Sequence, residues 1–415
     1  MRPGHWRRLR ALSALLGFLG PGLITGAAGD DAGGIATYAQ IGAQYGYSML
    51  WALVLITVSL IVVQVQVARL GVVTGKGLAE VIREQFGVRW TAVAMLVLLV
   101  ANGAVTVAEF AGMAAAGELF GIPRFFAVPI MAVVVWLIVV RASYTVAEKI
   151  FLLLSTALLT YIGAAFLAQP DWSEVIHSLI TPSLSADTGY LTTLVALVGT
   201  TITPYMLFYL QSSLSDKGVR LEDYPSERAD VVIGSVLSDL VALFIIVSTA
   251  ATLYANGILV TTAEDAARAL EPLAGPYART LFGIGLFGAS MLAASVLPLS
   301  TAYAVCGAFG WERGVSRAWF EAPIFNFLYT ALIALAAAFV LIPGLPLIQV
   351  IVATQFLNGL LLPIILIFVV RLVNDRDLMG DHINSRLFNV LSYGTTAVLI
   401  VLTIALLVSP FFGAS

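Results

Sequence analysis

Two adjacent carboxylates, Asp30 and Asp31, stand inside an otherwise apolar stretch that also holds three glycines between residues 29 and 34. A carboxylate at bilayer depth costs about 2.5–3.5 kcal/mol on insertion scales, so it is by default a candidate for function. Glycine eases departure from helical geometry, and unwound backbone within lipid must face protein, water or an ion. We therefore expect segment 29–34 to be unwound, with Asp31 as a metal ligand. Asp30 is a second candidate ligand, and because two adjacent buried carboxylates repel, we expect one of the two acids to be turned away or protonated.

A second interruption lies at residues 199–205, where the sequence reads Gly-Thr-Thr-Ile-Thr-Pro-Tyr. Pro204 lacks an amide hydrogen and clashes with the preceding helical turn, so a helix through this stretch has to break. The threonine run supplies hydroxyl groups that can hold the loosened backbone. We expect the Thr200 carbonyl, and the carbonyl or hydroxyl of Thr203, to be neutral oxygen donors at the same site.

Gln355 and Asn358 are spaced i and i+3, which places them on one face of a predicted helix. With the two breaks they form a set of hard oxygen donors, which suits Mg²⁺, Mn²⁺ or Ca²⁺ better than later transition metals. Mg²⁺ usually keeps several of its waters and is bound through one or two carboxylates. The sequence thus predicts a divalent metal site whose ion is substrate, with no resident cofactor.

Other polar residues in apolar stretches are weaker candidates. Glu109 can hold a proton, line an ion path or pair with a neighbouring helix, and the sequence leaves these alternatives open. For Asp239 a structural hydrogen bond is the favoured interpretation. Asn326 and Gln211 are expected to hydrogen-bond between helices. The three histidines lie in loops or at the terminus, which excludes a histidine metal cluster: His5, His177 and His382.

The composition places these residues in a membrane protein. The chain has 415 residues, of which 60% are hydrophobic and only 11% charged, whereas soluble domains carry about 25% charged residues. This balance argues against a soluble enzyme or a disordered chain, and a net charge of −3 indicates no nucleic-acid partner. A crossing helix needs about 20 apolar residues. That length predicts eleven spans, near residues 15–46, 49–72, 91–118, 125–141, 148–168, 189–214, 231–254, 277–304, 322–342, 347–372 and 388–411.

The two interruptions fall in the first and sixth spans, five apart, as expected for an inverted repeat of five plus five spans with a midplane site. We expect one membrane domain over 1–415, with a tail at 1–14, the first repeat and sixth span at 15–214, and the remaining spans at 215–411. An N-terminus on the cytoplasmic side places 18 of the 21 lysines and arginines on that side, in agreement with the positive-inside rule. The C-terminus is then outside.

Residues 20–26 and 31–37 resemble the first span of the natural-resistance-associated macrophage protein (Nramp) transporters, and residues 199–205 resemble the sixth-span motif of that family. The resemblance extends through all eleven spans and implies an all-α, leucine-transporter-like fold that carries divalent metals. It also implies metal-site positions. The asparagine ligand of the family falls on Gly34, its thioether ligand on Thr203 and its sixth-span histidine on Tyr205. Gln355 aligns with a tenth-span glutamine.

At Gly34, Thr203 and Tyr205 the chain differs from the family pattern, and it has Thr106 where proton-coupled members have an aspartate. In these differences it resembles the Nramp-related magnesium transporter branch. That resemblance implies a largely hydrated ion in a wider site, for which Gly34 and the small threonines leave room, and transport without obligatory proton coupling. We therefore expect a plasma-membrane transporter of Mg²⁺, and also Mn²⁺, that works by alternating access. The bilayer and the metal ion are its expected partners, with no obligate protein partner.

Three alternatives remain. A proton-coupled Mn²⁺/Fe²⁺ importer can use Glu109 or Asp30 as a relay. A sodium-coupled amino-acid transporter on the same fold is disfavoured, because Asp31 repels a substrate carboxylate. A non-transporting sensor or a membrane enzyme has little support, since the sequence has no nucleophile–base set, zinc motif or phosphate loop.

Overall fold

The computed structural model describes residues 31–141, 153, 156–314 and 319–412, so the predicted tail, the first half of the first span and Asp30 lie outside the described residues. Within those ranges every regular element is helical, as predicted. Eight segments are long and apolar enough to cross a membrane by length and composition. They comprise α4 (Leu50–Thr74), α5 (Leu78–Leu119), α10 (Thr188–Thr201) with α11 (Pro204–Asp216), α12 (Tyr224–Thr252), α15 (Ala278–Phe309), α16 (Pro323–Val340), α17 (Leu347–Leu372) and α19 (Arg386–Phe412).

Shorter helices occupy the remaining predicted spans. They are α3 (Ala32–Tyr45) in the first, α6 (Arg124–Arg141) in the fourth, and α8 (Thr160–Leu167) with a preceding 3₁₀ turn in the fifth. Short helices also lie in the connections: α9 (Trp172–Ile180), α13 (Ala263–Ala267), α14 (Glu271–Ala274) and α18 (Arg376–Met379). A described helix therefore lies within each of the eleven predicted spans, and eight of these segments are long enough to cross a membrane.

The third span is longer than the predicted 91–118, because α5 begins at Leu78. Inside it Gly87 has φ of 76° and ψ of 175°, which is not helical. Only glycine adopts such dihedrals without strain, so the chain can kink here and continue in a new direction. The charged segment before residue 91 is thus a kinked extension of the span.

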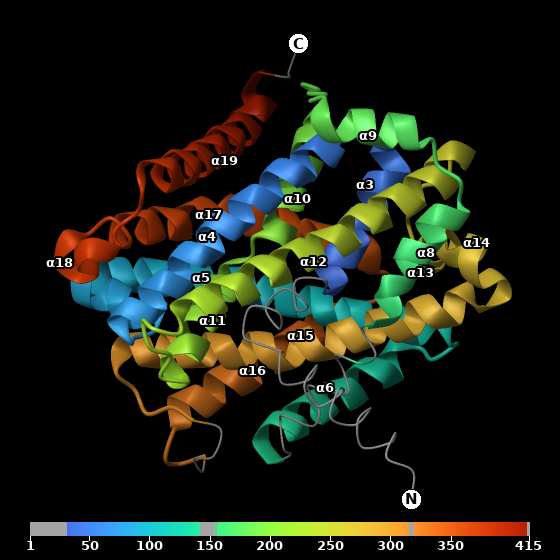
Figure 1. Cartoon of the computed structure of the whole chain (residues 1–415). Helices are drawn as coiled ribbons and strands as arrows, with labels where there is room; N and C mark the ends of the chain where they lie inside the picture. The colour runs from blue at the N-terminus through green and yellow to red at the C-terminus, as the bar shows by residue number, and fades with distance from the viewer. Residues whose placement is uncertain (1–30, 142–152, 154–155, 315–318, 413–415) are drawn as a thin grey trace, which may run out of the picture.

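The helices pack in two groups that meet around the broken spans. α5 packs along α15 and α17, whereas α12 packs along α3 and α4. Figure 1 shows α4 and α12 crossing one face side by side, with α15 and α16 along another edge. α10 contacts both α3 and α17, so the first half of the sixth span joins the two groups.

Two glycines let α10 approach α17 more closely than side chains would permit. A Cβ on Gly199 would lie 2.1 Å from the Gln355 carbonyl oxygen and 2.4 Å from the Gly359 nitrogen. A Cβ on Gly359 would lie 2.3 Å from the Val195 carbonyl oxygen. These contacts are with backbone atoms, which cannot move aside as a flexible side chain can. The close contact between α10 and α17 therefore requires glycine on both helices.

We predict that Gly199→Ala destabilises the protein by about 1–3 kcal/mol, because the added methyl group forces the two backbones apart. The matched control is Gly103→Ala in α5, where a Cβ would lie 3.6 Å from the Leu332 Cδ2 atom, an ordinary contact. Thermal unfolding in detergent should show a lower melting temperature for Gly199→Ala alone. Equal melting temperatures for the two variants would contradict the close packing of α10 on α17.

Candidate metal site

Asp31 immediately precedes α3, the described part of the first span. Its backbone is extended, with φ of −74° and ψ of −177°, and α3 begins at the next residue. Its Oδ1 atom accepts a hydrogen bond of 2.8 Å from the Gly34 amide, so the carboxylate caps the helix. The residue is 1% exposed, and its Oδ2 atom has no hydrogen-bond partner. A buried carboxylate oxygen without a partner is costly unless it meets a proton or a cation.

The prediction that the whole of segment 29–34 is unwound is wrong at its C-terminal end. Gly33 and Gly34 form the first turn of α3, because Asp31 caps the helix and satisfies the Gly34 amide. The small size of Gly33 is needed for packing instead. A Cβ on Gly33 would lie 1.9 Å from the Gln355 Nε2 atom. Gln355 therefore lies directly over this turn, next to Asp31.

Glu109 is the second carboxylate at the site. It is fully buried in α5, and its Oε2 atom accepts a hydrogen bond of 3.3 Å from the Ala32 amide. Its carboxyl group interacts directly with that of Asp31. Oε1 of Glu109 has no hydrogen-bond partner. Two neighbouring buried carboxyl groups cannot both carry an uncompensated charge, so a cation or a proton is required between them.

The sixth span is broken between Thr201, the last residue of α10, and Pro204, the first of α11. Because Pro204 has no amide hydrogen, the Thr200 carbonyl has no helical donor four residues on. The Gly199 carbonyl is freed as well, and it accepts a hydrogen bond of 2.8 Å from Asn358 Nδ2. Thr200 and Thr203 are both fully buried. The break thus presents oxygen atoms at the C-terminal, negative end of α10.

Gln355 and Asn358 both project from α17 toward the two breaks. Gln355 contacts the first turn of α3, whereas Asn358 holds the last turn of α10. Both residues are fully buried, and each has a side-chain oxygen without a hydrogen-bond partner. In the structure Gln355 therefore lies next to Asp31, and Asn358 supports the backbone of the sixth span.

The site gathers buried oxygen atoms that lack hydrogen-bond partners on four helices. These atoms are Asp31 Oδ2, Glu109 Oε1, Thr200 Oγ1, Gln355 Oε1 and Asn358 Oδ1. Such a donor set suits a hard divalent cation, bound directly or through its waters. In the part of the chain that the structure describes, no three side chains of histidine, cysteine, aspartate or glutamate come together. Neutral oxygens must therefore supply much of any metal coordination.

The remaining polar candidates lie elsewhere. Asp239 is 4% exposed and interacts with Thr57 of α4, away from the breaks. Gln211 Nε2 donates to the Lys76 carbonyl at 3.0 Å, in the loop between α4 and α5, so its bond is to a loop and not, as expected, to another helix. Asn326 differs from expectation, because its Nδ2 donates to the Ala322 carbonyl just before its own helix.

The sequence analysis missed Ser290 on α15. Its side chain is fully buried and has no hydrogen-bond partner. A Cβ on Gly112 would lie 2.4 Å from both Ser290 Oγ and Ala32 Cβ. α15 therefore reaches the start of α3 at Gly112 of α5. No sequence motif at Gly112 or Ser290 predicts this contact.

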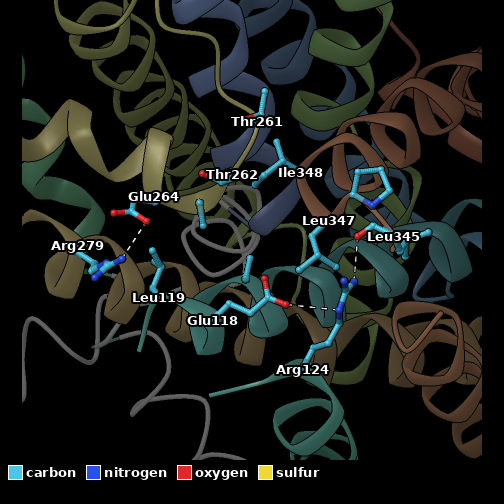
Figure 2. A pocket seen from close by; sticks show the side chains of 13 residues that line it. Glu118, Leu119, Arg124, Thr261, Thr262, Glu264, Arg279, Leu345, Leu347 and Ile348 are labelled. Carbon is cyan, nitrogen blue, oxygen red and sulfur yellow. Dashed lines mark hydrogen bonds and ion pairs between the residues drawn. The ribbon is translucent and has the colours of Figure 1, made fainter. Parts of the chain in front are cut away.

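A separate cavity of about 340 Å³ lies where α5 ends and where α15 and α17 begin, and Figure 2 shows the side chains that line it. Glu118 in its wall is nine residues beyond Glu109 on α5. The charged side chains that line this cavity form ion pairs with one another. Arg279 lies 2.9 Å from Glu264, and Arg124 lies 3.5 Å from Glu118. Among the described residues that line this cavity, both carboxylates are therefore paired, and the buried oxygens next to Asp31 and the sixth-span break remain the candidate metal site.

The chain is similar to known transporters along most of its length. A family model described as natural resistance-associated macrophage protein-like matches residues 22–409. The divalent metal cation transporter MntH of Erwinia tasmaniensis is 30% identical over 403 residues, which cover 93% of this chain and 92% of that protein. MntH of Yersinia pestis is 28% identical over 409 residues, covering 95% of each.

Solved structures share the fold. The manganese transporter of Eremococcus coleocola, in complex with an aromatic bis-isothiourea substituted compound, has a TM-score of 0.76 at 22% identity and covers 100% of this chain and 90% of that one. Mhp1, a nucleobase-cation-symport-1 family transporter, has a TM-score of 0.55 at 13% identity, covering 94% of this chain and 91% of Mhp1. The predicted leucine-transporter-like fold is thereby confirmed, and the described residues show the predicted break in the sixth span.

Proposed function

Since the chain belongs to the natural resistance-associated macrophage protein (Nramp) family, whose members are membrane transporters of divalent metal cations, we propose that it transports Mg²⁺ and also Mn²⁺. The ion would bind between the broken spans with part of its hydration shell. Asp31 would be the charged ligand, and Thr200, Thr203 and Gln355 would supply neutral oxygens. Asp30 is proposed as a second acid near the ion, and Gly34 as the residue that leaves room for water.

One observation carries this proposal: the Oδ2 atom of Asp31 is buried without a hydrogen-bond partner among further unpartnered oxygens. A hard cation compensates such a group most directly. The donor chemistry also argues against a site built for softer metals. Thr203 stands where a thioether would otherwise face the ion, and the sulfur of Met206 accepts from Gln64 Nε2 at 3.9 Å instead.

We propose alternating access as the mechanism, with a bundle that includes the first and sixth spans rocking against the remaining helices. α5 packs closely along α15 and α17, which supports the proposal that these three helices stay fixed while the bundle moves. An inside-negative potential favours cation entry by about 2.3 kcal/mol per charge for each 100 mV. Uptake across a plasma membrane, with the N-terminus inside and the C-terminus outside, would then need no coupled ion.

We predict that Asp31→Ala abolishes binding of both Mg²⁺ and Mn²⁺ in isothermal titration calorimetry, because it removes the charged ligand. The matched control is Asp239→Asn, which changes another buried aspartate away from the breaks. That variant should bind both ions as the unaltered protein does. Unchanged binding by Asp31→Ala, or equal loss in both variants, would rule out Asp31 as the principal ligand.

Thr203→Met should move the ion preference toward Mn²⁺, because a thioether favours softer metals over Mg²⁺. We expect the ratio of Mn²⁺ to Mg²⁺ affinities to rise about tenfold, which corresponds to about 1.4 kcal/mol. Competition of Mg²⁺ against Mn²⁺ uptake into proteoliposomes measures this ratio. An unchanged ratio in a folded variant would count against a place for Thr203 at the ion.

A proton-coupled importer is the second candidate, and the contact between Glu109 and Asp31 is the observation that favours it. The two proposals differ in proteoliposomes that contain a pH-sensitive dye. Uncoupled transport predicts metal uptake with no internal acidification at zero membrane potential. Acidification that accompanies uptake and disappears in Glu109→Gln would establish coupling through Glu109 instead.

A further inference from the structure

Two arginine side chains lie close together where the end of α4 meets the start of α12. Arg69 is five residues before the end of α4, and Arg228 begins the second turn of α12. The two guanidinium groups interact electrostatically with each other, and both interact with Tyr224, the first residue of α12. The Tyr224 hydroxyl donates to the Val65 carbonyl of α4 at 3.3 Å. This bond holds the two helices, and therefore the two positive charges, side by side.

In the part of the chain that the structure describes, neither arginine forms an ion pair with a carboxylate, because the ion pairs there join other residues. Arg69 is half-buried and donates from a terminal nitrogen to the neutral side-chain oxygen of Asn384. Its Nε atom is buried without a hydrogen-bond partner. Two neighbouring positive charges, one of them with a buried donor left unpaired, are costly unless an anion lies beside them.

The acidic residues nearest to Arg228 in the sequence do not supply that anion. Glu227 and Asp230 are one and two positions away, and side chains at these spacings do not share a face of a helix. Glu227 interacts instead with Lys217, just after the last residue of α11. The side chain of Arg228 is exposed, so it can contact a ligand that approaches from outside the protein.

An open pocket of about 440 Å³ lies along this face of α12. Tyr224 and Arg228 line it near the start of the helix, whereas Val232 and Ile233 line it one to two turns further into the span. Ile233 is 52% exposed on a helix that is long and apolar enough to cross a membrane. Tyrosine is typical of the membrane–water interface. The pocket is thus basic at the interface and apolar deeper in, as the headgroup and acyl chain of a phospholipid require.

We propose that Arg69 and Arg228 bind the phosphate group of an anionic phospholipid, whose acyl chain lies along Val232 and Ile233. Guanidinium suits this ligand because its planar N–H groups match two phosphate oxygens. Tyr224 is a positioning residue, since its hydroxyl is already bonded to α4. In the proposed orientation these helix ends are cytoplasmic, where basic pockets between membrane helices bind lipid headgroups.

The bound phosphate would connect three parts of the chain. Arg69 belongs to α4, Arg228 belongs to α12, and Asn384, which accepts from Arg69, lies just before α19. A ligand that binds only the folded protein stabilises it in proportion to its occupancy. This site is separate from the metal site and goes beyond the proposed transport function, so it can be tested by stability alone.

Thermal unfolding of the purified protein in a neutral detergent provides the test. Short-chain phosphatidylglycerol, which carries one net negative charge, should raise the melting temperature in a saturable manner. Short-chain phosphatidylcholine has the same chains and no net charge, and it should raise the melting temperature less at each concentration. Inorganic phosphate presents the anion without a chain, and it should also have a smaller effect than phosphatidylglycerol.

Arg228→Gln should raise the phosphatidylglycerol concentration for half-maximal stabilisation about fivefold, which corresponds to about 1 kcal/mol for one arginine at an anionic lipid. The matched control is Arg89→Gln, which removes the same charge from an exposed arginine of α5 and should leave that concentration unchanged. Arg228→Glu should abolish the saturable stabilisation, because its carboxylate repels the phosphate and compensates Arg69 instead. Arg228 is exposed, so both of its variants should fold.

An unchanged half-maximal concentration in Arg228→Gln with stabilisation retained in Arg228→Glu, or an equal change in Arg89→Gln, would overturn the site. Equal stabilisation by inorganic phosphate and phosphatidylglycerol at every concentration would overturn the lipid as its ligand. Metal binding at Asp31, measured separately by calorimetry, does not depend on any of these results.

Discussion

The structure depends on compensating one carboxylate inside a membrane protein. Asp31 is buried at the start of α3 with one oxygen bonded to the Gly34 amide and the other unpartnered. The buried carboxyl group of Glu109 interacts with it and adds a second negative group. In a medium of low dielectric constant this arrangement is stable only with a proton or cation at the pair. In the proposed function, a divalent cation bound at the pair would supply this compensation.

The helix breaks around Asp31 follow from the same constraint. Oxygen ligands from backbone are available only where helical hydrogen bonds are missing, and Pro204 removes one such bond in the sixth span. The freed Gly199 carbonyl would be costly in an apolar setting, but Asn358 donates to it at 2.8 Å. Close packing of Gly199 on Gly359 brings α17 near enough for this bond. The break is therefore held in place by a neighbouring helix.

Much of this could be predicted from local sequence. Hydropathy located the eight long apolar helices of the described residues, and the proline at 204 located the break in the sixth span. The extent of the first break was predicted wrongly, since helix capping by Asp31 returns Gly33 to the helix. The partners of the site were harder to find, because the bond from Ala32 to Glu109 joins residues 77 apart and that from Asn358 to Gly199 joins residues 159 apart. Such contacts are set by packing of whole helices.

The position of the ion itself tests the central claim most directly. Crystals grown with Mn²⁺ and measured at the manganese absorption edge would locate the metal by anomalous scattering. The account predicts a peak between the broken spans, beside Asp31 Oδ2 and the Thr200 carbonyl, with oxygen atoms of protein or water as its only ligands. A peak elsewhere, with Asp31 instead bonded to protein groups alone, would contradict it.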